Sequence, residues 1–254
     1  MVDIVYLISL VLIIKKHMKI NQIYHTSHCG STLMATLLAN STTVYCEPPW
    51  TSSLLNGDLE LDNVTIKFGS GWCPFSNQLP GKKVFLYRKL KHHLFKIKSS
   101  QYIDRIISTK YEHHLKHIHP SLKEYQFTTD LEKIAFMWLN NVQWISDVDD
   151  VLWIEANSFF KNKKETMDKV CDYFNLDRVK NYELSNVYVK SFGLIGNEKS
   201  INESEIPNLG QVKSLYPSFG IIEDDLCDQF PEIGDLVMWV EETLNIKKQK
   251  SNKY

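Results

Sequence analysis

Short apolar runs alternate with longer stretches of helical spacing through most of the chain. The apolar runs are rich in β-branched and aromatic residues and end in Gly, Pro or charged residues, a pattern that predicts strands. Five strands are predicted, at 20–24, 43–46, 64–68, 83–87 and 151–155.

Apolar residues recur at helical spacing between and after these runs. Helices are predicted at 31–39, at two or three places within 89–118 and 131–146, at 158–174 and at 235–245, whereas 184–231 is polar and irregular. Strands that alternate with helices are typical of a mostly parallel sheet with helices on both faces. The sequence therefore predicts an α/β fold in three layers around a central, mostly parallel sheet.

Chemically active residues follow four of the predicted strands. A polar turn begins at Thr26, Glu47 follows the second strand, Lys67 lies near the end of the third, and Arg88 follows the fourth. Ligands of open α/β sheets bind beyond the carboxyl ends of the strands. If the strands are parallel neighbours, we expect these groups to gather on one edge of the sheet.

The turn after the first strand has the composition of an anion-binding loop, HTSHCGST over 25–32. A strand-to-helix turn points backbone N–H groups and the positive end of the helix dipole at an anion. It is not a Walker A loop, because His25 replaces the first glycine and Ser31 the lysine. An ordinary capped turn remains the alternative. The anion-binding candidates are Ser27, His28, Cys29, Gly30, Ser31 and Thr32.

Composition narrows the class of protein. The chain has 254 residues, of which 43% are apolar, so we expect one domain over 18–254. The net charge of −1 gives no basic field for nucleic acid, which is not expected as a partner. Five scattered cysteines without a CxxC pair favour a reducing compartment, and a cytoplasmic location is expected.

An apolar segment, residues 4–14, precedes the first predicted strand. It is shorter than the roughly 20 residues that a spanning helix needs, and it lacks the flanks of a secretory signal. Three interpretations stay open for residues 1–17: a packed segment, membrane contact through 4–14, or sequence upstream of a start at Met18.

Taken in order, several segments resemble the sulfotransferase family. The turn sequence HCGSTL resembles the donor-binding loop of that family, VYCEP its second strand and acidic turn, and VTIK the strand that follows. KVFLYR resembles the strand that leads to its second donor site, and 131–174 is also similar. The resemblance spans about 20–176. It implies a P-loop-like fold and 3′-phosphoadenosine 5′-phosphosulfate as the donor, with no metal.

The resemblance also implies roles for individual residues. Arg88 contacts the 3′-phosphate of the donor, and Lys96 stands where the family often has a serine. Glu47 is the general base, because some members use a glutamate there. From their chemistry alone, His28, which replaces the usual Lys or Arg, and Lys67 are expected to stabilise the bridging oxygen. The reaction moves a sulfuryl group to a hydroxyl or amine of an unknown carbohydrate, small-molecule or peptide acceptor.

Two other functions remain open, namely another P-loop transferase or small-molecule kinase, and a non-catalytic nucleotide-binding protein. A histidine-rich stretch raises a separate question, since His113 and His117 would share a helix face and could hold a metal. Because no HExxH pattern or cysteine partner accompanies them, we expect a solvated helix end. The late donor-binding loop is not located, with Lys199 and Lys213 as candidates.

Overall fold

The computed structural model describes residues 20–59, 61–100, 103–180, 182, 186–189, 195–196, 211–214 and 220–243. The expectations for residues 1–17 and for Lys199 lie outside these residues. No helix in the described part of the chain is long and apolar enough to cross a membrane.

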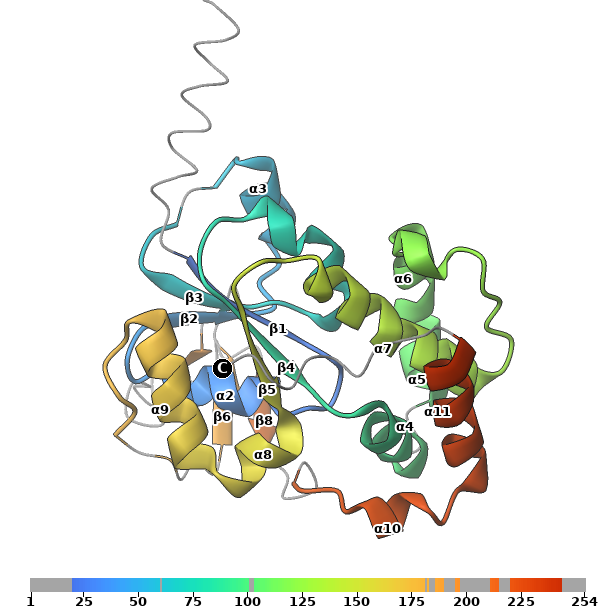
Figure 1. Ribbon diagram of the computed structural model, residues 1–254. Coiled ribbons are helices and arrows are strands. Elements are labelled where there is room, and N and C mark those ends of the chain that lie inside the picture. Colours follow the sequence, from blue (N-terminus) through green and yellow to red (C-terminus); the bar gives the residue numbers. More distant parts are fainter. Residues whose placement is uncertain are drawn as a thin grey trace, which may run out of the picture.

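A five-stranded parallel sheet forms the centre of the molecule (Figure 1). Its strands lie in the order β2-β3-β1-β4-β5. They are β1 (Ile20–His25), β2 (Thr43–Cys46), β3 (Val64–Lys67), β4 (Lys83–Tyr87) and β5 (Val151–Glu155). The predicted parallel sheet is confirmed, and three of the five strands have the predicted bounds.

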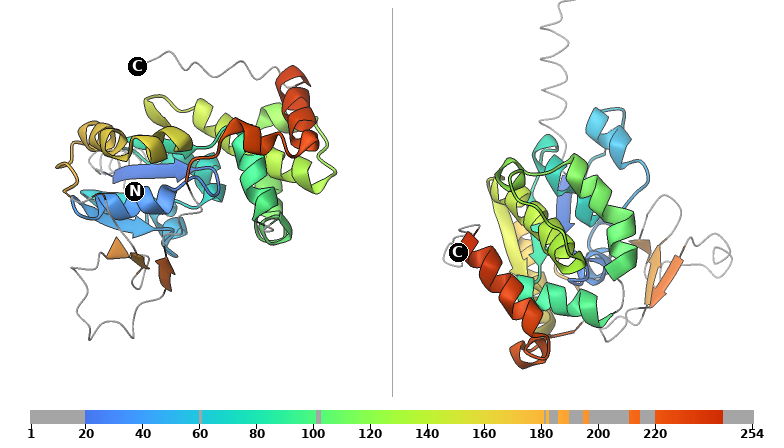
Figure 2. Two further views of the ribbon diagram at one scale, coloured as in Figure 1. Left: turned by 90° about the horizontal axis from the view of Figure 1, so that it is seen from below. Right: turned by 90° about the vertical axis from the view of Figure 1, so that its right-hand side faces the viewer.

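Each face of the sheet is covered by helices, which completes the three predicted layers (Figure 2). On one face, Ile23 and Leu86 pack with α2 (Ser31–Leu38), α8 (Ala156–Lys161) and α9 (Lys163–Phe174). On the other face, Tyr24 and Phe85 pack with η1 (Ser70–Gln78) and α7 (Asp130–Ser146). Successive residues of a strand point to opposite faces, so an almost continuous apolar run fills both cores.

A second group of helices lies to one side of the sheet and shares α7 with it (Figure 1). Leu94 and Ile97 of α4 pack there with Ile233 and Val240 of α11. The other members are short, and Thr129 begins α7 with a capping box. The elements are α4 (Leu90–Ser99), α5 (Ile103–Ile106), the π-helical η2 (Ile107–Tyr111), α6 (Glu112–Lys116), η3 (Pro120–Leu122), α10 (Asp224–Cys227) and α11 (Pro231–Thr243).

Two predictions need correction. The segment expected to be irregular contains α10 and a small antiparallel sheet of β6 (Asn186–Val189), β7 (Ile195–Gly196) and β8 (Gln211–Ser214). Strands of two to four residues are too short to show a clear alternation. The helix expected at 158–174 is two helices, because Asn162 leaves the helical conformation with φ −124° and ψ 53°.

Candidate functional site

The fold places the carboxyl ends of β1 and β4 side by side, because the two strands are parallel neighbours. The connection from β1 to β2 runs through α2 on one face of the sheet, and the connection from β4 to β5 runs through α7 on the other. The point where connections diverge in this way is the usual ligand site of an open α/β sheet. Here β1 ends in the turn 26–30, and β4 ends at Tyr87, directly before Arg88.

The turn 26–30 has the backbone geometry of an anion cradle. Gly30 precedes the first residue of α2 with φ 93°, and His28 also has a positive φ of 58°. The first N–H groups of an α-helix have no partner within the helix, so those of α2 open into this turn. A Cβ on Gly30 would lie 2.6 Å from Cζ of Phe160, so the positive φ and this close approach both favour glycine there. Ser31 and Thr32 begin α2 beside it.

Cys29 anchors the turn to the core. Its Sγ donates to the carbonyl oxygen of Leu86 at 3.2 Å, and burial raises the pKa of the thiol to about 11. The side chain is therefore a neutral thiol at pH 7. Its contribution to an anion site would come from the backbone, as for Gly30.

Glu47 and Lys67 form an ion pair at the ends of β2 and β3. Cys46 lies opposite Lys67 in the register, and the N–H of Glu47 donates to the carbonyl oxygen of Lys67 at 2.7 Å. Lys67 Nζ then binds Glu47 Oε1. The two partners differ in exposure, since the Lys67 side chain is 2% exposed and that of Glu47 is 47% exposed.

The charge of Lys67 keeps Glu47 ionised. It is the main cause that lowers the pKa of Glu47 to about 2, against the opposing effect of burial, and His25 adds to it. At neutral pH Glu47 is a carboxylate whose side chain is partly exposed to solvent. The predicted base and the predicted lysine therefore lie in direct contact.

His25 is a site residue that the sequence did not single out. It is buried, and its Nδ1 lies 2.8 Å from the carbonyl oxygen of Thr26, so Nδ1 carries the proton. Its Nε2 lies 3.9 Å from Glu47 Oε1 and has no hydrogen-bond partner among the described residues. Burial, with the charge of Lys67, lowers the pKa of His25 to about 3. A neutral imidazole thus turns a lone pair toward Glu47.

Arg88 lies on the opposite side of the turn from Glu47. Its backbone N–H donates to Thr26 Oγ1 at 3.2 Å, and its Nε donates to the carbonyl oxygen of His28 at 2.9 Å. The remaining guanidinium nitrogens donate to Asn157 Oδ1 at 3.1 Å and to the carbonyl oxygen of Gly220 at 3.0 Å. Arg88 has no exposed surface. The predicted closeness of Arg88 to the turn is confirmed, and its side chain joins the turn to two other segments.

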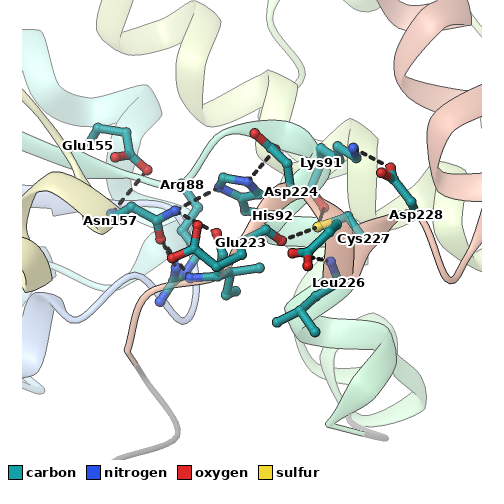
Figure 3. Close-up of polar contacts among 12 residues, drawn as sticks. Arg88, Lys91, His92, Glu155, Asn157, Glu223, Asp224, Leu226, Cys227 and Asp228 are labelled. Carbon is teal, nitrogen blue, oxygen red and sulfur yellow. Dashed lines mark hydrogen bonds and ion pairs between the residues drawn. The ribbon is translucent and has the colours of Figure 1, made fainter.

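Asn157 and the segment around α10 complete this side of the site, as Figure 3 shows. Asn157 donates to the carbonyl oxygen of Ile222 at 2.7 Å and accepts from its N–H at 3.1 Å. His92 binds Asp224 at 2.8 Å. The segment from Gly220 onward is thereby fixed against β4 and α8, although it is far away in sequence.

Two residues of the basic stretch after Arg88 pair with acidic residues. Besides the pair of His92 with Asp224, Lys91 Nζ lies 2.6 Å from Asp228 Oδ1. Acidic residues of α10 and of its C-terminal end thus face two of these basic side chains. Lys96 is half-buried, and burial lowers its pKa, with a further contribution from Arg88. It belongs to the electrostatic environment of Arg88.

His28 is not a permanent cation. Burial is the main cause that lowers its pKa to about 4, and the charges of Lys110, Lys96 and Arg88 lower it further. It is therefore neutral at pH 7. The position where the sequence resemblance places Lys or Arg carries no charge of its own in this chain.

Lys110 is a second residue that the sequence analysis missed. Its Nζ donates to Ser70 Oγ at 3.0 Å and to Ser27 Oγ at 3.3 Å. Lys110 belongs to η2, which is 83 residues beyond Ser27. A helical lysine with no motif around it gives no local signal, so only the packing of η2 against the turn shows it.

The histidine-rich stretch is a structural feature and differs from the expected solvated helix end. His114 and His119 are buried. His113 Nε2 lies 2.8 Å from the carbonyl oxygen of Gly71, and His119 Nε2 lies 2.9 Å from Asp147 Oδ2. Within the described residues, no group of three or more His, Cys, Asp or Glu is arranged to hold a metal ion.

Comparisons with known proteins give structural matches only. No family model and no curated protein matches the chain. A sulfotransferase domain from the curacin biosynthetic pathway is 12% identical, with a TM-score of 0.45, over 90% of this chain and 98% of that one. A sulfotransferase from Alicyclobacillus acidocaldarius is 11% identical, with a TM-score of 0.44, over 89% and 95%. The mouse sulfotransferase SULT7A1, complexed with PAP, is 10% identical, with a TM-score of 0.43, over 93% and 90%.

Proposed function

We propose that this protein transfers a sulfuryl group from 3′-phosphoadenosine 5′-phosphosulfate to a hydroxyl or amine acceptor. The observation that carries the proposal is the Glu47–Lys67 pair beside the turn 26–30. A carboxylate that can accept a proton and an ammonium that can stabilise a leaving oxygen lie next to a cradle for phosphate and sulfate oxygens. The order of segments that resembles sulfotransferases supports the same assignment.

In the proposed reaction, the acceptor oxygen or nitrogen attacks the sulfur of the donor. A new bond to sulfur forms while the bond from sulfur to the bridging oxygen breaks. The bridging oxygen leaves with the electron pair as part of adenosine 3′,5′-bisphosphate. The proton of the acceptor passes to Glu47, whose carboxylate is exposed to solvent. The turn and Lys67 stabilise the negative charge that develops on the leaving phosphate.

Lys67 couples the binding of the donor to the basicity of Glu47. While it binds Glu47, it holds the pKa of the carboxyl at about 2, so Glu47 is a weak base. A donor whose bridging oxygen attracts Lys67 would draw the ammonium away from Glu47. The pKa of Glu47 would then rise toward its ordinary range, which makes it a better base only when the donor is present.

Donor binding is assigned to the turn and the groups on the β4 side. The residues from Ser27 to Thr32 enclose the 5′-phosphosulfate, and Arg88 and Lys96 provide positive charge for the 3′-phosphate. Because Arg88 already donates to three protein acceptors, direct contact with a phosphate requires it to exchange one of them, for example the carbonyl oxygen of Gly220.

A kinase is the second candidate that the fold allows. It is disfavoured because the turn has Ser31 where a Walker A loop has the lysine that reaches the β- and γ-phosphates. A non-catalytic nucleotide-binding protein is the third candidate. The exposure of Glu47 and its contact with a buried lysine favour a reactive role over a purely structural one.

Thermal unfolding with different nucleotides separates these candidates. Adenosine 3′,5′-bisphosphate at about 100 times its dissociation constant is expected to add about 2.7 kcal/mol to the free energy of unfolding. ATP at the same concentration is expected to add much less. A preference for ATP would support the kinase, and no shift with either ligand would contradict a nucleotide site.

The role of Glu47 is tested by Glu47→Gln, with Glu165→Gln as a control on the exposed surface of α9. Glu47→Gln is expected to bind adenosine 3′,5′-bisphosphate like the unaltered protein. Its sulfuryl transfer, followed with labelled donor and a panel of hydroxyl and amine acceptors, is expected to fall about 100-fold or more. Glu165→Gln should change neither. Transfer by Glu47→Gln at the full rate would show that another group is the base.

A further inference from the structure

A general base must hold the proton that it removes, and the neighbours of Glu47 decide how well it can do so. In the ion pair, Glu47 Oε1 faces the ammonium of Lys67, which has N–H donors and no acceptor. A protonated carboxyl group gains an O–H donor of its own, for which Lys67 offers no partner. A favourable site for the proton therefore needs an acceptor close to the same oxygen, and that acceptor must come from another residue.

His25 provides an acceptor at this point. Its Nδ1 lies 2.8 Å from the carbonyl oxygen of Thr26, which can only accept, so Nδ1 carries the ring proton and Nε2 keeps a lone pair. This Nε2 is buried, has no hydrogen-bond partner among the described residues and lies 3.9 Å from Glu47 Oε1. Buried polar atoms are nearly always hydrogen-bonded, so an exception calls for an explanation. Here the unpartnered acceptor lies beside the oxygen that would carry the proton.

The central sheet fixes the spacing of these two groups. His25 is the last residue of β1, opposite Leu86 of β4, and the N–H of Thr26 donates to the carbonyl oxygen of Leu86 at 3.1 Å. Glu47 follows β2, and its N–H donates to the carbonyl oxygen of Lys67, the last residue of β3. Because β3 lies between β2 and β1, the Glu47 side chain extends past the end of β3 toward His25.

The backbone of Glu47 is held in an uncommon conformation. Its φ is 48°, in the left-handed region that residues other than glycine rarely adopt. Residues in such conformations cluster at functional sites, where the surrounding structure restrains them. The backbone hydrogen bond and the ion pair with Lys67 provide that restraint here. This restraint is consistent with a carboxylate whose direction toward Lys67 and His25 matters.

A hydrogen bond between the two groups can exist in only one protonation state of Glu47. A carboxylate and the lone pair of a neutral imidazole are both acceptors, so no hydrogen bond joins them while Glu47 is ionised. Once Glu47 has taken the proton of the acceptor substrate, its new O–H can donate to Nε2 of His25. Closing 3.9 Å to an ordinary hydrogen-bond length requires a movement of about 1 Å by the Glu47 side chain. The proton stays on Glu47, and no other bond forms or breaks in this step.

The charged groups around His25 keep its ring neutral. Burial is the largest cause that lowers the pKa of His25 to about 3. The charges of Lys67 in β3 and Lys110 in η2 act in the same direction, against the opposing effects of Glu47 and of the bond to Thr26. Cations from two elements thus oppose a second proton on the ring. At pH 7 the lone pair of Nε2 is therefore available as an acceptor.

We propose that His25 is a positioning residue of the transfer, whose Nε2 accepts a hydrogen bond from protonated Glu47 and so makes Glu47 a stronger base. A hydrogen bond that only the protonated form makes favours that form. Departure of Lys67 removes the charge that keeps Glu47 ionised, and His25 then offers the partner that the proton needs. His25 acts through Glu47, because its Nε2 is buried. The inference rests on the proposed function, since it concerns the same proton.

The first measurement is made on the ligand-free protein and does not depend on transfer. The nitrogen chemical shifts of an imidazole ring, measured by NMR, distinguish a nitrogen that carries a proton from one that does not. For His25 they are expected to show a protonated Nδ1 and an unprotonated Nε2 at pH 7. The signals are assigned by their absence in His25→Phe. A proton on Nε2 would overturn the inference and leave the proposed function standing.

The second measurement is the pH dependence of kcat, with labelled donor and the same panel of acceptors. His25→Phe keeps a planar ring and removes the acceptor nitrogen, so kcat is expected to fall about tenfold. The acidic limb of the profile reports the pKa of the base in the complex, and it is expected to move to lower pH by about one unit. Binding of adenosine 3′,5′-bisphosphate should stay within about threefold, because the acceptor nitrogen serves the proton and not the donor.

Two further variants control for a merely structural effect. His25→Gln offers an amide oxygen as an acceptor and should recover part of the loss, with kcat lowered only about threefold. His119→Phe removes another buried histidine, whose ring contacts Ser121 and Asp147. It should leave kcat and the acidic limb unchanged.

The kinetic outcomes separate the inference from the proposed function. If the unaltered protein transfers a sulfuryl group and His25→Phe does so at the same rate with the same pH profile, the inference is wrong and the proposed function stands. An equal fall of kcat in His25→Phe and His119→Phe, or in His25→Phe and His25→Gln, would also overturn the inference, since the acceptor atom would not matter. If the unaltered protein transfers to no acceptor of the panel, both fail.

Discussion

The two sides of the turn 26–30 use positive charge in opposite ways. On the β2–β3 side, Lys67 is buried and, within the described part of the chain, pairs with the exposed carboxylate of Glu47. On the β4–β5 side, Arg88 is buried and donates to a network of neutral acceptors, the carbonyl oxygens of His28 and Gly220 and the amide of Asn157. Lys67 thus contacts a side chain that is exposed to solvent, whereas Arg88 contacts backbone and amide oxygens of the protein.

This difference indicates that the Lys67–Glu47 pair can change on ligand binding, whereas the hydrogen bonds of Arg88 hold the structure of the site. A buried ammonium with a single exposed partner can change that partner when a negatively charged oxygen arrives, at little structural cost. A guanidinium that donates to three half-buried acceptors cannot leave them without the loss of a hydrogen bond at each. We therefore infer that Glu47 and Lys67 are the adjustable part of the site, and that Arg88 chiefly fixes its shape.

The largest expected effect comes from Arg88→Met. This change removes a buried guanidinium that donates to three half-buried acceptors, and it is expected to lower the free energy of unfolding by about 3–5 kcal/mol. Lys67→Met replaces a buried ammonium with an apolar side chain of similar length and leaves Glu47 in contact with water, so a loss of only about 1 kcal/mol is expected. Chemical denaturation of both variants measures the difference.

If Arg88→Met and Lys67→Met lose the same stability, the proposed difference between the two sides of the turn is wrong. Asn157→Leu offers an independent check on the Arg88 side, because it removes one acceptor of Arg88 and both bonds to Ile222. Its loss should be intermediate between the other two.

The sequence predicts the strands and their shared edge well, because the signals that mark a strand lie within a few neighbouring residues. β2, β4 and β5 are short runs bounded by turn signals, and each has the bounds that the pattern indicates. Because parallel strands align their carboxyl ends, Glu47, Lys67 and Arg88 could be assigned to one edge from their places at or just after the ends of strands.

The partners of these residues could not be predicted from the sequence. Arg88 and Gly220 are 132 residues apart, and Lys110 and Ser27 are 83 apart, with no periodic pattern that links either pair. The protonation of His28 was equally hidden, because its pKa depends on burial and on three cations from other elements. The spacing of residues along the chain therefore predicts which of them lie at the carboxyl edge of the sheet. Only the tertiary packing shows which charged groups contact one another there.

A loss of stability of intermediate size is expected at low pH, because a buried histidine lies on each side of the turn. Burial is the main cause that lowers the pKa of His93 to about 3, with contributions from His28 and Arg88. Between pH 6.5 and about 3 the unfolded chain therefore binds a proton at His93 that the folded protein does not. Stability from this group is complete above pH 6.5 and is lost as the pH falls, by about 1.4 kcal/mol per pH unit.

The variant His93→Gln should reduce the slope of the unfolding free energy against pH by about 1.4 kcal/mol per pH unit between about pH 6 and 4. His25→Gln should do the same on the other side, because burial and Lys67 lower the pKa of His25 to about 3. Urea titrations at a series of pH values measure the slopes. An unchanged slope in His93→Gln would mean that this histidine is already protonated in the folded protein.

The smallest expected effect concerns the turn that both sides share. Gly30 and Gly57 both have a positive φ, 93° and 82°, so an alanine at either position should cost about 1 kcal/mol of backbone strain. A Cβ at Gly57 meets nothing within 4 Å, whereas one at Gly30 lies 2.6 Å from Cζ of Phe160. Gly30→Ala should therefore destabilise the protein by about 1 kcal/mol more than Gly57→Ala. Phe160→Leu should remove this extra cost, since it shortens the side chain that the new methyl group would meet. If the difference persists in the Phe160→Leu background, the strain lies in the turn itself and not in its contact with α8.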